Sequence, residues 1–226
     1  MKKVPLYLVL SLNGGYVDTV GFLALGGLFT AHVTGNFVTL GASVALGLGG
    51  GLAKLLALPA FCLVIFLTRC VGLMLNRRGR PVMRPFLGGI LALLLVALAL
   101  AIEFGPFLDL NSTPALAIGM VMIAAMAIQN GLHRVYLTKS PPTTMMTGTT
   151  TQIMLDLADL AVGKDIELRS TVSTRLTRMS LSVLCFACGC ALAATAYISN
   201  PVWCFAPPVI FATIALFAKV ATPEGD

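Results

Sequence analysis

Long apolar blocks separated by short charged turns constrain this chain more than any other feature of its sequence. Its 226 residues are 58% hydrophobic and only 11% charged, whereas a soluble domain carries about 25% charged residues. So few charges do not cover the surface of a soluble domain of this size. Several blocks also reach the roughly 20 residues that a helix needs to cross a bilayer. The sequence therefore predicts an all-α integral membrane protein with several crossings.

The apolar blocks divide into eight segments, and two of these are shorter and more polar than the others. The short segments, 33–50 and 146–162, are rich in Gly, Ser or Thr. The remaining six are expected to cross the membrane. In chain order, the eight segments run over 4–29, 33–50, 53–75, 84–104, 114–137, 146–162, 174–198 and 201–220.

The two short segments open with similar motifs, which indicates a duplication. Val33–Asn36 (VTGN) begins the first and Met146–Thr149 (MTGT) begins the second. Upstream of each motif, Asn13–Gly14 matches Asn130–Gly131. The order of long, short, long and long segments is also the same around both motifs. One membrane domain made of two repeats is therefore predicted, the first over 1–110 and the second over 111–226.

The distribution of Lys and Arg predicts how these repeats are oriented, because cytoplasmic loops carry an excess of positive charge. If the short segments do not cross, Lys2, the cluster from Arg77 to Arg84, and Arg134 all lie on the cytoplasmic side, with Asp109 outside. If all eight segments cross, the Arg cluster and Arg134 move outside. Six transmembrane helices plus two short or re-entrant helices is therefore the better interpretation. Both termini are then cytoplasmic, and the halves are inverted repeats, as in many transporters and channels.

A short helix that begins inside a membrane needs partners for its free end, because lipid offers none. Thr, Gly and Asn at such a start are good N-cap residues, and Gly also permits close backbone approach. Two helix N-termini meeting near the midplane would present N–H donors and positive dipole ends to an anion or a polar solute. The alternative is that both motifs only cap their helices and pack against a neighbour.

Asp18 is the most informative single residue, because it lies near the middle of the first segment. A carboxylate within lipid is costly, so Asp18 is expected to face the protein interior. It is a candidate proton carrier or cation contact, and the alternative is a fixed ion pair or hydrogen bond. The run Asn13-Gly14-Gly15 before it predicts a kink or an unwound turn.

Other polar residues support narrower expectations. His32 titrates near neutral pH or has a capping role, and Arg134 either snorkels or pairs with Asp18 across the two halves. Asp156 is expected to be solvated or interfacial. The six cysteines lie in apolar blocks and are expected to pack rather than bind metal, so neither a metal nor a cofactor is predicted. The predicted substrate-binding residues are Asn13, Tyr16, Asp18, His32, Thr34, Gly35, Asn36, Asn130, His133, Thr147, Gly148 and Thr149.

The residues from Gly15 to Phe22, followed by Gly26–Phe29 and Val33–Asn36, resemble the signature of the YoaK family. These are bacterial integral membrane proteins filed under a domain of unknown function. The resemblance is strongest over the first segment and the start of the second. It implies a multi-pass protein of the bacterial inner membrane and does not imply a substrate.

Together these observations favour a secondary transporter of a small polar or anionic solute, with a midplane site at the repeat interface and proton coupling through Asp18 or His32. A passive channel for a small solute is the alternative. A non-transporting structural protein and a membrane enzyme rank below these, and no enzyme activity is predicted because His32 and His133 are scattered. The expected partners are the solute and the lipid bilayer, with no nucleic acid, and a homo-oligomer is left open.

Overall fold

The computed structural model describes residues 4–162 and 166–217, and within these ranges the regular structure is helical, without a strand. Five of the described helices are long and apolar enough to cross a membrane, so the prediction of an all-α, multi-pass membrane protein is confirmed. The elements are α1 (Leu6–Ala24), α2 (Gly35–Leu46), α3 (Gly51–Arg77), α4 (Met83–Phe104), α5 (Thr113–Tyr136), α6 (Met146–Val162), α7 (Ile166–Ser199), the 3₁₀ helix η1 (Trp203–Phe205) and α8 (Pro207–Phe217).

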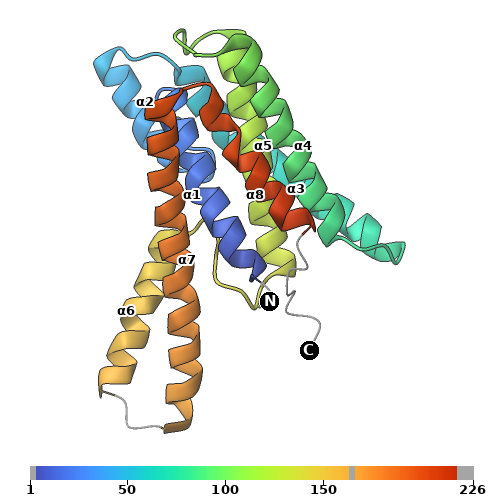
Figure 1. The fold of residues 1–226 in the computed structure, drawn as a ribbon, viewed down its shortest axis with the longest axis vertical. Helices are drawn as coiled ribbons and strands as arrows, with labels where there is room; N and C mark the ends of the chain where they lie inside the picture. The colour runs from blue at the N-terminus through green and yellow to red at the C-terminus, as the bar shows by residue number, and fades with distance from the viewer. Residues whose placement is uncertain (1–3, 163–165, 218–226) are drawn as a thin grey trace.

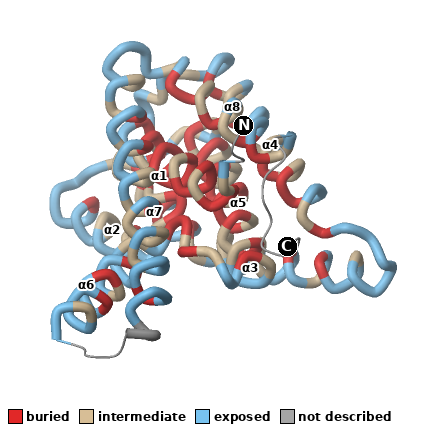
Figure 2. Tube along the Cα trace, turned by 60° about the horizontal axis from the view of Figure 1, so that its bottom comes forward, coloured by how far each residue is buried: buried red, intermediate tan, exposed pale blue. Residues whose placement is uncertain are grey.

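The helices α1 and α5 form the centre of the bundle, and the others surround them (Figure 2). Helix α1 packs against α5, α7 and α8, while α5 also packs against α3 and α4. The helices α4 and α8 are in contact with each other. The short helices are the least embedded, since α2 packs only on α3 and α6 only on α7.

Helix α1 is continuous through Asn13-Gly14-Gly15, so no unwound turn forms there, and a kink stays a prediction. The glycines serve close packing instead. A Cβ atom added at Gly15 would overlap the carbonyl of Phe186 on α7, and one added at Gly189 would overlap the carbonyl of Leu12 on α1. Glycine is required here because the two helices cross backbone against backbone.

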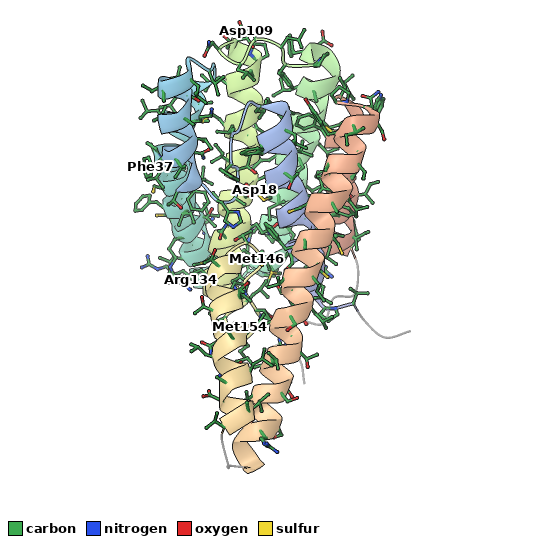
Figure 3. All side chains as sticks on the ribbon, turned by 90° about the vertical axis from the view of Figure 1, so that its left-hand side faces the viewer. Asp18, Phe37, Asp109, Arg134, Met146 and Met154 are labelled. Carbon is green, nitrogen blue, oxygen red and sulfur yellow. The ribbon has the colours of Figure 1, made fainter. Side chains whose placement is uncertain are left out.

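The chain between α1 and α3 enters the bundle and leaves it at the same end. Helix α1 ends at Ala24, five residues before the predicted end, and Gly26 and Gly27 turn the chain with φ values of +62° and +85°. Gly26 and Gly50 both lie against Leu110, in the turn between α4 and α5. The intervening residues descend to the level of Asp18, and α2 then returns (Figure 3). The short segment 33–50 is therefore re-entrant with respect to the bundle.

A second re-entrant stretch follows α5 at the opposite end. Residues 137–145 turn back into the bundle, where Thr143 and Thr144 contact Gly14. Helix α6 then runs outward along α7, and both project well beyond the other helices (Figure 1). Helix α7 begins at Ile166, eight residues before the predicted start, because its first half forms this hairpin with α6.

Charged residues mark the two ends of the bundle. Arg134 lies toward the end where α1 begins, and Asp109 lies in the turn at the opposite end (Figures 1 and 3). This separation agrees with the charge distribution used to predict the orientation. Which end is cytoplasmic, and in which membrane, stays a prediction.

Candidate functional site

Asp18 binds the tip of the first re-entrant stretch. Its Oδ1 atom accepts the backbone N–H groups of Thr30 and Ala31, each at 2.7 Å, and that of His32 at 3.4 Å. Three successive N–H groups converging on one oxygen form an anion-binding concavity of the backbone. These bonds offset the cost of a carboxylate that is only 5% exposed.

The second carboxylate oxygen of Asp18 faces the imidazole of His32. The distance from Asp18 Oδ2 to His32 Nδ1 is 2.6 Å. The two side chains differ in exposure, at 6% for Asp18 and 37% for His32. The pair therefore connects a buried carboxylate to a partly accessible ring that can gain or lose a proton.

A cavity of about 500 Å³ opens beside this pair, between α1, the re-entrant stretch and α7. Three phenylalanines and the His32 ring make up half of its lining residues. The ring centres of Phe22 and Phe29 lie 5.0 Å apart, and those of His32 and Phe186 lie 5.6 Å apart. Such walls suit the apolar part of a small solute, and His32 and Asp18 lie where they could contact its polar part. The lining residues are Asp18, Thr19, Phe22, Phe29, His32, Gly35, Phe186 and Cys190.

Asn36 holds the other side of the re-entrant stretch. Its amide oxygen accepts the Phe29 N–H at 2.8 Å, and its amide nitrogen donates to the Phe29 carbonyl at 2.7 Å. Thr34 precedes α2 with helical backbone angles and makes no capping bond through its side chain. Thr34 therefore occupies the N-cap position without a capping bond, and the Asn36 side chain binds the backbone of Phe29 instead.

A separate polar cluster joins the two halves at the centre of the bundle. The Asn13 amide donates to Gln129 Oε1 at 3.1 Å, and Gln129 Nε2 donates to the Leu10 carbonyl and to Thr143 Oγ1. The Asn13 Oδ1 atom is buried and has no hydrogen-bond partner among the described residues. Gln129 thus links α1, α5 and the second re-entrant stretch.

The remaining predicted residues lie away from the Asp18 cavity. Tyr16 donates to the Cys204 carbonyl at 3.0 Å and faces α8. Asn130 accepts from the Thr144 hydroxyl and, with His133, lines a second cavity of about 140 Å³. Its other walls come from α3 and from the second re-entrant stretch.

The second Thr-Gly motif does not reach the Asp18 cavity. Thr147 and Gly148 are exposed, and a Cβ atom at Gly148 would meet nothing within 4 Å. Thr149 is buried, and its hydroxyl donates to the Met145 carbonyl. Gly35 is the one motif residue that lines the cavity. The two helix starts therefore do not share this cavity.

A family model for proteins of unknown function, DUF1275, matches residues 6–218. The chain belongs to this family. The match confirms the expectation of a domain-of-unknown-function family, while the narrower YoaK name stays a prediction. Searches of curated proteins and of solved structures give no match.

In this DUF1275 member, the motif of the first 36 residues has a structural explanation. Gly15 permits the crossing with α7, and Gly21 leaves room for Thr30 and Leu28. Asp18 and Asn36 then fix the backbone of the re-entrant stretch from two sides. The motif therefore encodes one local unit, which consists of α1, residues 25–34 and the start of α2.

Several polar contacts differ from what the sequence predicted. Asp18 pairs with His32, and no ion pair with Arg134 forms among the described residues. Asp156 is fully buried rather than solvated, because Arg175 donates to both of its oxygens. This pairing holds the pKa of the Asp156 carboxyl below its usual value. In the sequence, this pair is indicated only by the positions of Asp156 and Arg175 on two successive helical segments.

Proposed function

We propose that this chain is a secondary transporter built from two inverted repeats, with the Asp18–His32 pair at its solute and proton site. The observation that carries the proposal is a titratable pair that both holds a re-entrant backbone and lines a cavity. A proton gained or lost there would change the bonds that keep residues 30–32 in place. Proton binding and movement of the stretch would then be coupled.

The packing of the helices supports the repeat. The proposed repeat makes α1 to α4 the counterparts of α5 to α8, in the same order. When each helix is replaced by its counterpart, the α1–α7 contact becomes the α5–α3 contact, and the α4–α5 contact becomes the α8–α1 contact. The α2–α3 contact likewise becomes α6–α7, and α4–α8 maps onto itself. A twofold relation between the halves would produce this pattern, and inversion would place the re-entrant stretches at opposite ends, as they are here. In this proposal the five long apolar helices α1, α3, α4, α5 and α7 cross the membrane, and the shorter apolar stretch Trp203–Phe217 makes the sixth crossing.

The cavity favours a small solute that carries a polar or anionic group. When His32 is protonated, its ring offers a positive charge beside the N–H groups of residues 30–32. The three phenylalanines around it suit an apolar portion of the same solute. In this proposal the halves move relative to each other, so that the cavity faces each side of the membrane in turn.

Transport in proteoliposomes with a pH-sensitive dye inside tests this function. We expect a solute from a panel of small organic anions and polar metabolites to drive saturable proton movement and to accumulate against its gradient. Asp18→Asn and His32→Gln should abolish this coupling. Glu103→Gln removes an exposed carboxylate and serves as the matched control. Absence of flux with every solute, or full flux in both site variants, would contradict the proposal, and flux without accumulation would indicate a channel.

A further inference from the structure

A third cavity, about 520 Å³ in volume, lies between the chain that follows α5 and the first half of α7. It is separate from the Asp18 cavity and shares no lining residue with it. Three cationic side chains border it, Lys139 from the loop and Arg175 and Arg178 from the helix. This concentration of positive charge differs from the aromatic lining of the Asp18 cavity and points to a different ligand.

One face of α7 lines this cavity. Thr171, Thr174, Arg175 and Arg178 follow each other at spacings of three, one and three residues, which places all four on the same side of a helix. The hydroxyl of Thr138 comes from the facing loop. Hydroxyl and cationic donors on two facing walls are the groups that bind phosphate oxygens.

Two of the three cations are available for a ligand. Arg175 is held by Asp156, and Asp159 adds a second negative charge near it. Lys139 and Arg178 form no ion pair within the part of the chain that the structure describes. The Arg178 guanidinium lies over the Tyr7 ring, 5.5 Å from its centre, which orients the side chain without neutralising its charge.

The position of Arg178 along α7 places this cavity at the edge of the membrane. Arg178 is followed by residues 179–199, which contain no charged side chain. Such a stretch is long enough to cross the hydrocarbon core. Arg178 therefore lies where the apolar part of α7 ends, at the depth of lipid headgroups, where clustered Lys and Arg attract anionic lipids.

We infer that this cavity binds a phosphate-bearing anion, whose phosphate lies between Lys139 and Arg178. An anionic lipid headgroup and a free phosphate compound share this chemistry. The inference does not depend on the proposed transport function, because it uses neither Asp18 nor His32.

Native mass spectrometry of the detergent-purified full chain tests this site with phosphatidylglycerol and with phosphatidylcholine. We expect retention of phosphatidylglycerol over phosphatidylcholine, and at least tenfold weaker binding in a Lys139→Gln/Arg178→Gln variant. Arg78→Gln/Arg80→Gln removes the same charge from the exposed turn between α3 and α4 and should bind as the wild type does. Lys139→Arg/Arg178→Lys keeps both charges and should retain most of the binding.

A thermal-shift titration with inorganic phosphate distinguishes the two sources. Stabilisation by millimolar phosphate that is lost in the Lys139→Gln/Arg178→Gln variant would assign the site to a free phosphate ligand. Stabilisation by phosphatidylglycerol alone, with the same loss, would assign it to a lipid. Equal retention of both lipids together with no response to phosphate, or unchanged binding in the double Gln variant, would overturn the inference.

Discussion

The two re-entrant stretches occupy corresponding places in the chain but are held by different chemistry. The first is bound by a carboxylate, since Asp18 accepts three backbone N–H groups and pairs with His32. The second is bound by neutral groups, with Gln129 donating to Thr143 and Thr144 donating to Asn130. Among the described side chains of the second half, a buried carboxylate is found at Asp156 on α6, outside the bundle.

In the proposed repeat, this difference would give the two halves different tasks. A carboxylate inside the bundle can respond to protons at the cavity, whereas neutral amide and hydroxyl groups hold the chain at any pH. The first stretch is therefore held by groups that can titrate, whereas the contacts named for the second stretch are neutral. Helix α2 stays beside α3, but α6 leaves the bundle with α7.

Asp18→Ala should lower the stability of the protein more than any other substitution considered for the two stretches. It leaves three backbone N–H groups and His32 without their acceptor, and removing one partner of a buried pair costs about 3–5 kcal/mol. The melting temperature of the purified protein measures the loss. Asp18→Asn keeps an oxygen acceptor and should be less destabilised. Wild-type stability in Asp18→Ala would show that the carboxylate does not hold the stretch.

The next largest effect is expected from alanine at Gly15, where α1 crosses α7. Alanine at Gly131, where α5 crosses α3, should have a much smaller effect. Gly15→Ala forces a methyl group into the Phe186 carbonyl, and overpacking of this kind costs about 1–3 kcal/mol. Gly131→Ala meets only a side-chain methyl of Thr68, at 3.3 Å, and gains helix propensity of about 1 kcal/mol. Its melting temperature should therefore stay close to that of the wild type. An equal loss in both variants would contradict the backbone contact between α1 and α7.

The α6–α7 hairpin should open in acid. The pKa of Asp156 in the folded protein lies below its ordinary value of 3.8, so its contribution to stability is complete above that pH and is lost as the pH falls through the folded pKa. Since Arg175 is 45% exposed, the pair contributes about 1 kcal/mol.

Spin labels at Met154 and Thr177, in a background without the native cysteines, report the opening of this hairpin. The distance between them should broaden below pH 4, which is about the ordinary Asp pKa, and should already be broad at neutral pH in Asp156→Asn. A distribution that does not change with pH or with the substitution would show that the ion pair does not hold the hairpin.

Thr144→Val should have the smallest effect. It removes one neutral hydrogen bond to Asn130, which contributes about 1 kcal/mol. Thr147→Val, at an exposed position, should leave the melting temperature unchanged. A loss as large as that of Asp18→Ala would show that the second stretch is held as strongly as the first.

The class of protein and the importance of Asp18 could be predicted from the sequence. The length of the apolar blocks and an acidic residue inside one of them are both local features of the chain. The sequence also indicated that segment 33–50 differs from a crossing helix. It did not anticipate His32 as the partner of Asp18, because that pairing depends on the turn at Gly26 and Gly27. Of the two alternatives for Arg134, the pair with Asp18 does not form among the described residues, because His32 occupies that place.

Contacts between distant segments account for the other differences. Phe186 and Cys190 line the Asp18 cavity only because α1 and α7 cross closely, and nothing in their own sequence marks them. The burial of Asp156 depends on Arg175, nineteen residues later on a different helix. The cavity between α7 and the loop around Lys139 also depends on the fold, because its two walls come from segments about 30 residues apart in the sequence.

The most direct test of the account is the side of the membrane on which residue 48 lies. Single cysteines at Leu48, Leu108 and Arg80, in a cysteine-free background, are labelled with an impermeant maleimide in intact and inside-out membranes. The account predicts that Leu48→Cys and Leu108→Cys react from one side and Arg80→Cys from the other, because residues 26–50 enter and leave at the same end. Labelling of Leu48→Cys from the same side as Arg80→Cys would show that this segment crosses, and the inverted arrangement would then be wrong.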